Sequence, residues 1–276
     1  MGEVVAAGFL GILQGLTEFL PVSSSAHLIL VPWVFGWTPE GIAFDVALHV
    51  GTAAAVLAYF WKEWLLLITE AIRGILAGDP FGNEHRRLAW YLVAGTVPAV
   101  IAGLAFEHVV EQVLRSPLVT VVTLTFFGLL LFAAEKRGKQ TRSIVDFTLI
   151  DSIWIGLSQA VALVPGVSRS GITITTALFR GADRASAARF SFLLSTPVIV
   201  GAGLLETARL LRGAGSGTAG PAWAVMVVGT VAASVTGFLC IRYFLRYLQT
   251  RTLLPFVVYR WALAIVVLIF YLQGRR

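Results

Sequence analysis

The sequence has few charged residues and almost no cysteine. Charged residues make up 13% of the 276 positions, about half of the roughly 25% that is usual for soluble domains. The single cysteine, Cys240, excludes a disulfide within the chain. No Walker lysine motif occurs, and no basic run is interleaved with aromatic residues as nucleic-acid binding would require. These absences argue against a soluble enzyme, a nucleotide phosphate donor and a nucleic-acid partner.

The chain is instead rich in long apolar segments, with 57% hydrophobic residues and a mean hydropathy of +0.83. Full-length spans are predicted at about 43–61, 88–106, 117–134, 186–206, 222–241 and 254–273, because each is near the ~20 residues that cross a bilayer. Residues 62–87 are expected to be a loop. The amino terminus does not resemble a signal peptide, since Glu3 stands where a basic region would be. The sequence therefore predicts an all-α polytopic membrane protein with about six full transmembrane helices.

Two further apolar segments, about 4–35 and 148–180, are interrupted by short polar tips. Pro21 and a run of serines break the first, and Pro165-Gly166 breaks the second. Each apolar arm is shorter than a membrane span. Irregular backbone at membrane depth is tolerated only where it is buried in protein or lines a wet cavity. We therefore predict two re-entrant helical hairpins.

The order of one hairpin and three spans occurs twice, which predicts halves of about 1–135 and 145–276 within a single membrane domain, 1–276. Gln14 precedes Pro21 much as Gln159 precedes Pro165, although the two spacings differ by one residue. Three spans per half is an odd number, so the halves have opposite orientations. Most basic residues then fall on one side, which is the cytoplasmic side by the positive-inside rule. The other side receives Arg115, Arg209, Arg212, Arg275 and Arg276. An inverted-topology repeat of this kind brings the two tips together near the midplane.

The second tip contains an arginine within an apolar region. Arg169 is accompanied by the hydroxyls of Ser168, Ser170 and Thr173. An ionisable residue at membrane depth suggests a functional site, and a guanidinium at a helix N-terminus favours a phosphate. The alternative is a loop whose arginine reaches a lipid headgroup.

The first tip contributes an acid, an imidazole and hydroxyls. Gln14 and Glu18 share a helix face, and a divalent cation or Arg169 would keep Glu18 ionised; the alternative is a neutral Glu18 between helices. His27 follows Ser24 by three residues, so the pair could form an activated nucleophile, or His27 could itself accept a phosphoryl group. A packing role for His27 is the alternative. Together these groups are typical of phosphoryl transfer.

Two signatures resemble a known family. Residues 14–28 and 165–173 resemble the two signatures of the bacterial undecaprenyl-diphosphate phosphatases, the bacitracin-resistance proteins, and Pro255–Arg260 resembles their last span. The resemblance implies hydrolysis of undecaprenyl diphosphate and other long-chain prenyl diphosphates in the bacterial inner membrane. It also implies a divalent cation, Mg²⁺ or Ca²⁺, recycling of the lipid carrier for peptidoglycan synthesis, and resistance to bacitracin. The resemblance leaves a homodimer open.

Roles carried over from the family fall on both tips. Glu18 would be a metal or acid–base carboxylate, Ser24 and His27 nucleophile and partner in an order left open, and Arg169 the diphosphate clamp. Substrate binding would involve Ser23, Ser25, Gly166, Ser168, Ser170, Gly171 and Thr173.

Gln14 departs from the many relatives that have glutamate there. Its amide could join Glu18 at a metal through the carbonyl oxygen, but it cannot act as a base. Asp45 and Asp151 are expected near span ends rather than in the site. The architecture alone would also suit a transporter or flippase of a lipid phosphate without hydrolytic activity.

Overall fold

The computed structural model describes residues 2–37, 42–112, 116–213 and 223–273. Within these ranges the chain forms α-helices and one 3₁₀-helix, with no β-strand. Five of the described helices are long and apolar enough to cross a membrane, or six if the bent pair α3 (Ile42–Tyr59) and α4 (Trp61–Leu76) counts as one span. The chain is thus an all-helical, multi-pass membrane protein, as predicted. The helices are α1 (Gly2–Phe19), α2 (Ser24–Phe35), α3 (Ile42–Tyr59), α4 (Trp61–Leu76), α5 (Glu84–Gln112), α6 (Pro117–Arg137), η1 (Ile144–Asp146), α7 (Leu149–Val161), α8 (Arg169–Phe179), α9 (Arg184–Gly213), α10 (Trp223–Leu248) and α11 (Leu254–Leu272).

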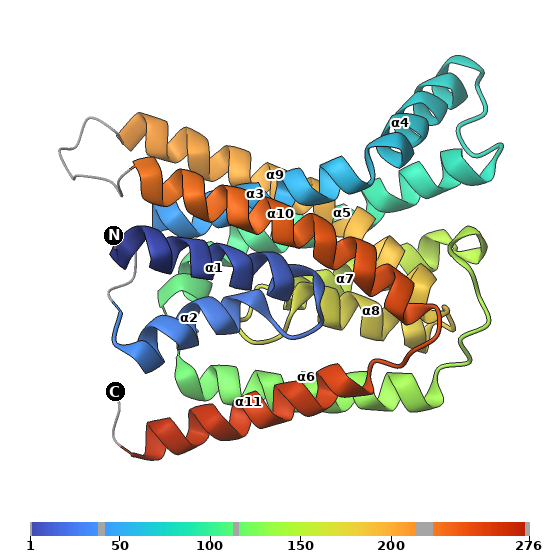
Figure 1. Ribbon diagram of the computed structural model, residues 1–276. Helices are drawn as coiled ribbons and strands as arrows, with labels where there is room; N and C mark the ends of the chain where they lie inside the picture. The colour runs from blue at the N-terminus through green and yellow to red at the C-terminus, as the bar shows by residue number, and fades with distance from the viewer. Residues whose placement is uncertain (1, 38–41, 113–115, 214–222, 274–276) are drawn as a thin grey trace.

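The long helices run side by side between two ends of the molecule, and both termini lie at the same end (Figure 1). The helices α1 and α2 form a hairpin that opens toward that end, whereas α7 and α8 open toward the opposite end. The two connections meet inside the molecule: the Ser170 hydroxyl donates to the Leu20 carbonyl over 3.0 Å. The Gly166 N–H also points at Ser25 Oγ, 3.5 Å away.

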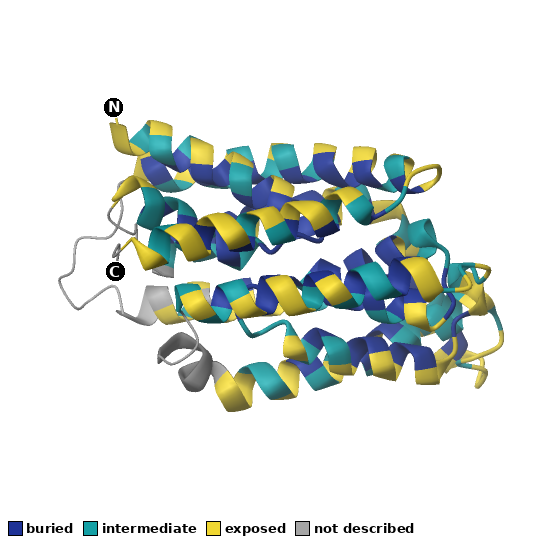
Figure 2. Ribbon diagram, turned by 90° about the horizontal axis from the view of Figure 1, so that it is seen from below, coloured by how far each residue is buried: buried dark blue, intermediate teal, exposed yellow. Residues whose placement is uncertain are grey.

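The helices have buried residues on their inner faces and exposed residues on their outer faces (Figure 2), and many of the exposed residues are large and apolar. On α6, Leu124 and Leu131 are fully buried, whereas Val122 and Leu129 are more than half exposed. An apolar outer surface of this kind fits a hydrocarbon environment. Small residues allow α1 to lie against α10, because a Cβ added at Gly11 or Gly15 would collide with the α10 backbone.

The prediction of a loop over residues 62–87 was wrong for its first half, because α4 occupies Trp61–Leu76. Its charged residues suggested a loop, but Trp64, Leu67, Ala71 and Gly74 recur at helical spacing and are the more buried positions. The axis of α4 is bent by 73° from that of α3. The predicted loop is present only over residues 77–83, between α4 and the next helix.

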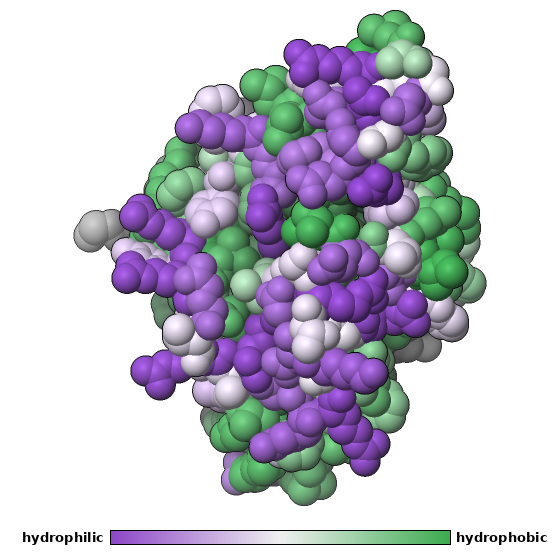
Figure 3. Space-filling view, turned by 90° about the vertical axis from the view of Figure 1, so that its right-hand side faces the viewer, coloured by the Kyte–Doolittle hydropathy of each residue, from purple (hydrophilic) through white to green (hydrophobic). Residues whose placement is uncertain are grey.

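Charged side chains gather at the end opposite the termini, as the space-filling view shows (Figure 3). Asp151, in the first turn of α7, accepts hydrogen bonds of 2.6 Å from both Arg142 and Arg180. Arg184 on α9 pairs with Glu135 on α6. This is the end that the charge distribution assigns to the cytoplasm. Of the residues predicted for the other side, Arg115, Arg275 and Arg276 lie outside the described residues.

Candidate active site

Two helix breaks with the same backbone geometry build the site. Ser23 caps α2 with φ 76°, and its side chain accepts from the Ala26 N–H. Ser168 caps α8 with φ 72°, and its side chain accepts from the Gly171 N–H. Positive φ at a residue other than glycine costs on the order of 1–3 kcal/mol and is often found at functional sites. The first N–H groups of each helix have no acceptor within the helix, so each break offers a helix N-terminus suited to an anion.

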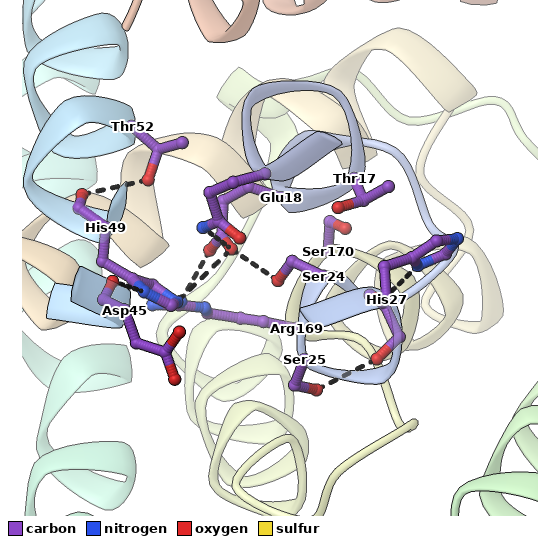
Figure 4. Close-up of polar contacts among 12 residues, drawn as sticks. Thr17, Glu18, Ser24, Ser25, His27, Asp45, His49, Thr52, Arg169 and Ser170 are labelled. Carbon is purple, nitrogen blue, oxygen red and sulfur yellow. Dashed lines mark hydrogen bonds and ion pairs between the residues drawn. The ribbon is translucent and has the colours of Figure 1, made fainter. Parts of the chain in front are cut away.

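An ion pair between Glu18 and Arg169 joins the two breaks (Figure 4). Arg169 Nη2 lies 2.6 Å from Glu18 Oε1, although the residues are 151 positions apart. The other carboxylate oxygen accepts from Gln14 Nε2 at 3.0 Å and from the Ser24 hydroxyl at 2.7 Å. Glu18 is 6% exposed. The carboxylate is therefore held by donors from both tips, and the two sequence signatures meet as predicted.

The Ser24 hydroxyl donates its hydrogen bond to Glu18 and not to His27. The His27 imidazole is directed away from Ser24: Nδ1 lies 2.7 Å from the Ser23 carbonyl and Nε2 lies 2.6 Å from the Tyr259 hydroxyl. A carbonyl can only accept, so in the neutral ring Nδ1 carries the proton and Tyr259 donates to Nε2. The rings of His27 and Tyr259 also stack, with an interplanar angle of 10°. The expected Ser24–His27 pairing is thus replaced by a Ser24–Glu18 pairing.

The remaining residues predicted to bind substrate lie at the two tips, and several of their polar groups hold the tips together. Ser170 donates to the Leu20 carbonyl and Ser25 lies 3.5 Å from the Gly166 N–H, which joins the tips. Within each tip, the hydroxyl oxygens of Ser23 and Ser25 lie 3.1 Å apart and those of Ser168 and Ser170 lie 3.3 Å apart. Gly166 has φ 87°, and a Cβ there would collide with Thr123, so only glycine fits.

Thr173 lies behind the site rather than facing it. Its side chain is fully buried, its hydroxyl donates to the Arg169 carbonyl at 2.7 Å, and it lies 2.6 Å from Ser191 Oγ. Asp45 lies in the first turn of α3, as expected for a span end, but Figure 4 shows it beside His49 and Arg169, so the expectation that it lies outside the site was wrong.

Sequence reasoning missed three residues at the site. His49 on α3 places Nε2 3.8 Å from Glu18 Oε2, and its Nδ1 lies 2.8 Å from the Asp45 carbonyl. Tyr259 and Arg260 reach the breaks from α11. The signal was available for His49 and Arg260, since an ionisable residue within a span suggests a functional site. Their partners could not be named without the packing of the spans.

The donor atoms around Glu18 fit a divalent cation only in combination with a phosphate. No group of three or more His, Cys, Asp or Glu side chains is placed to hold a metal within the described ranges. However, Gln14 Oε1 is a buried oxygen with no hydrogen-bond partner, and the amide nitrogen of the same side chain donates to the Glu18 carboxylate. Mg²⁺ commonly binds to one or two carboxylates together with substrate phosphates.

Comparison with known proteins identifies the family. The family described as bacitracin resistance protein BacA matches residues 7–266. Three relatives named undecaprenyl-diphosphatase illustrate the similarity. That of Desulforudis audaxviator is 46% identical over 260 residues, covering 94% of this chain and 95% of the relative. That of Thermodesulfovibrio yellowstonii is 44% identical over 273 residues, covering 98% of each. That of Hahella chejuensis is 48% identical over 254 residues, covering 92% and 93%. The chain therefore belongs to the BacA family of bacitracin resistance proteins.

Proposed function

We propose that this protein hydrolyses undecaprenyl diphosphate to undecaprenyl phosphate and inorganic phosphate in the bacterial inner membrane. The reaction would recycle the lipid carrier for peptidoglycan synthesis and give resistance to bacitracin. The observation that carries the proposal is the contact between Glu18 and Arg169, which unites an acid, a hydroxyl and a guanidinium at two helix N-termini. The names of the relatives supply the substrate.

The proposal includes an inverted repeat with two re-entrant hairpins. The hairpins open toward opposite ends of the molecule. If the halves are aligned on Ser23 and Ser168, then Gln14 and Gln159 each lie nine residues before the serine. Gly11 and Gly156 each lie twelve residues before it. This alignment removes the one-residue mismatch that alignment on the prolines leaves, and it supports two related halves.

In this mechanism Ser24 is the nucleophile and Glu18 its base. The Ser24 hydroxyl already donates to Glu18 over 2.7 Å, within reach for proton transfer. As the Oγ–phosphorus bond forms, the proton passes to Glu18 and the bond from phosphorus to the oxygen of the lipid phosphate breaks. Glu18 then returns the proton to that departing oxygen. Water attacks the phosphoserine with its proton passing through Glu18 to Ser24 Oγ, which releases inorganic phosphate and restores the serine.

Arg169 and the two helix N-termini would bind the diphosphate. The guanidinium offers paired donors suited to phosphate oxygens, and it adjoins Ser24 through their shared partner Glu18. The first N–H groups of α2 and α8 add the positive ends of two helix dipoles. Charge neutralisation and positioning are the main contributions in phosphoryl transfer.

A divalent cation, Mg²⁺ or Ca²⁺, would be held by Glu18 and the Gln14 carbonyl oxygen, with His49 beside them and the substrate oxygens completing the ligands. When bound, it would neutralise charge on the diphosphate. Since only one carboxylate is present among these groups, cation affinity would depend strongly on substrate.

Purified protein in detergent micelles tests the function, because micelles provide no second compartment for transport. We expect phosphate release from undecaprenyl diphosphate, whereas a flippase without hydrolytic activity would release none. The Arg169→Ala variant should lose about 100- to 1,000-fold in kcat, while Arg246→Ala, at an exposed position of α10, should retain activity. Full activity of Arg169→Ala would show that Arg169 does not bind the diphosphate. If the wild type released no phosphate, the proposed hydrolytic activity would be refuted.

A further inference from the structure

Arg260 is a cation buried beside the active site without a carboxylate partner. Its side chain on α11 is 1% exposed, and in the described part of the chain no acid pairs with it. Burying a charge is costly unless many hydrogen bonds satisfy it. We therefore expect a buried arginine without an acidic partner to have a specific role.

The guanidinium donates to backbone carbonyls of both helix breaks. Nη1 donates to Pro21 O at 3.2 Å in the first break and to Val167 O at 3.1 Å in the second. Nη2 donates to Gly166 O at 3.0 Å and also to Val167 O at 3.1 Å. Longer bonds reach Leu124 O at 3.3 Å and Thr123 O at 3.4 Å on α6. A single side chain therefore ties the two tips to each other and to a neighbouring helix.

The carbonyls that Arg260 binds lie next to the strained caps. Pro21 precedes Ser23 by two residues and Val167 precedes Ser168 by one, and these two serines have positive φ. Such conformations persist only where surrounding contacts determine them. The residues that follow the caps are Ser24 and Arg169, so any shift of either carbonyl moves a catalytic group.

We propose that Arg260 is a positioning residue for the reaction, which fixes the spacing between Ser24 in the first half and Arg169 in the second. This inference rests on the proposed function. A lysine cannot reproduce it, because an ammonium group has three donors at one point whereas the guanidinium reaches in several directions at once. The charge of Arg260, which carbonyl groups solvate without neutralising it, also adds positive potential behind the anion site.

The test compares Arg260→Lys and Arg260→Gln with wild type, using Arg242→Lys at an exposed position of α10 as the matched control. Three quantities are measured in detergent: kcat and KM for undecaprenyl diphosphate, the thermal midpoint, and hydrogen exchange of peptides over 20–26 and 164–171. We expect kcat of Arg260→Lys to fall about 100-fold, the effect of a displacement near 1 Å. We also expect faster exchange in both peptides, unchanged exchange in 223–248, and no change in the control.

Normal kcat in Arg260→Lys would overturn the proposal, as would faster exchange throughout the chain, which indicates a role in stability alone. If Arg260→Gln does not accumulate in the membrane, Arg260→Lys carries the test, because it keeps the buried charge. If the wild type releases no phosphate, the proposed function fails, but the exchange of the two peptides still shows whether Arg260 holds both tips.

Discussion

The two helix breaks share a backbone conformation but differ in the side chain that follows the cap. Both caps are serines with φ near 75°, and both accept from the N–H three residues on. The first helical residue is Ser24 in one break and Arg169 in the other. Since a helix N-terminus attracts anions whatever its sequence, this one residue distinguishes the two breaks: in the proposed mechanism it is the nucleophile Ser24 in the first half and the cation Arg169 in the second.

The helices before the breaks differ in the same way. Gln14 is followed four residues later by Glu18, to which it donates a hydrogen bond of 3.0 Å. At the same spacing Gln159 is followed by Leu163, and both polar atoms of the Gln159 side chain are buried without a partner. The acid is thus confined to the first half. An enzyme with this division needs both halves at one site, and the Glu18–Arg169 contact provides that.

The largest expected effect comes from removing the nucleophile of the first break. Ser24→Ala should lower kcat by about 10,000-fold or more, because losing an activated serine removes the covalent route. Phosphate release from undecaprenyl diphosphate in detergent measures this. Ser186→Ala is the matched control, since it removes a hydroxyl that donates to Asp183 at the start of α9 over 2.7 Å and that has no role in the proposed mechanism, and it should retain most activity.

The same assay also decides whether Ser24 or His27 is the nucleophile. If His27→Ala abolishes turnover while Ser24→Ala remains active, the nucleophile is the imidazole. If Tyr259→Phe and His27→Ala show the same moderate loss, the pair positions the first tip through the 2.6 Å bond between them.

A smaller effect should follow from adding a second acid to the first half. Gln14→Glu would place two carboxylates at i and i+4 on α1, and we expect tighter Mg²⁺ or Ca²⁺ binding, on the order of tenfold, because cation affinity follows ligand charge. Gln159→Glu is the symmetric control and should not change the metal titration, since no other acid lies four residues on. A metal titration of activity, with isothermal calorimetry as an independent readout, checks both. Equal responses of the two variants would mean that Gln14 is not near the cation.

The sequence predicts the meeting of the tips because an acid and an arginine at membrane depth must find partners. Pro21 and Pro165 mark the breaks for a similarly local reason, the loss of a helical hydrogen bond. The orientation of His27 could not be predicted, because its partner Tyr259 is 232 residues away. The helix α4 was missed because the charges at Lys62 and Arg73 suggested a loop, and the buried stripe along the helix was not recognised. The proposed alignment of the two halves could be fixed only from the cap serines seen in the structure. The spacing from glutamine to proline differs by one residue between the halves, whereas the spacing from glutamine to the cap serine is the same.

The smallest expected effect concerns the strain that the two breaks share. Glycine adopts positive φ freely, and replacing a serine cap by glycine costs only a few tenths of a kcal/mol. Ser23→Gly and Ser168→Gly should therefore each change stability by less than about 1 kcal/mol. Ser→Ala at either position should destabilise more, because alanine keeps the strain and loses the cap. Thermal midpoints of the four variants in one detergent measure this. If Ser23→Gly stabilises the protein whereas Ser168→Gly strongly destabilises it, the two breaks are stabilised by different interactions although their dihedral angles match. The Ser168 side chain then has a role beyond capping α8.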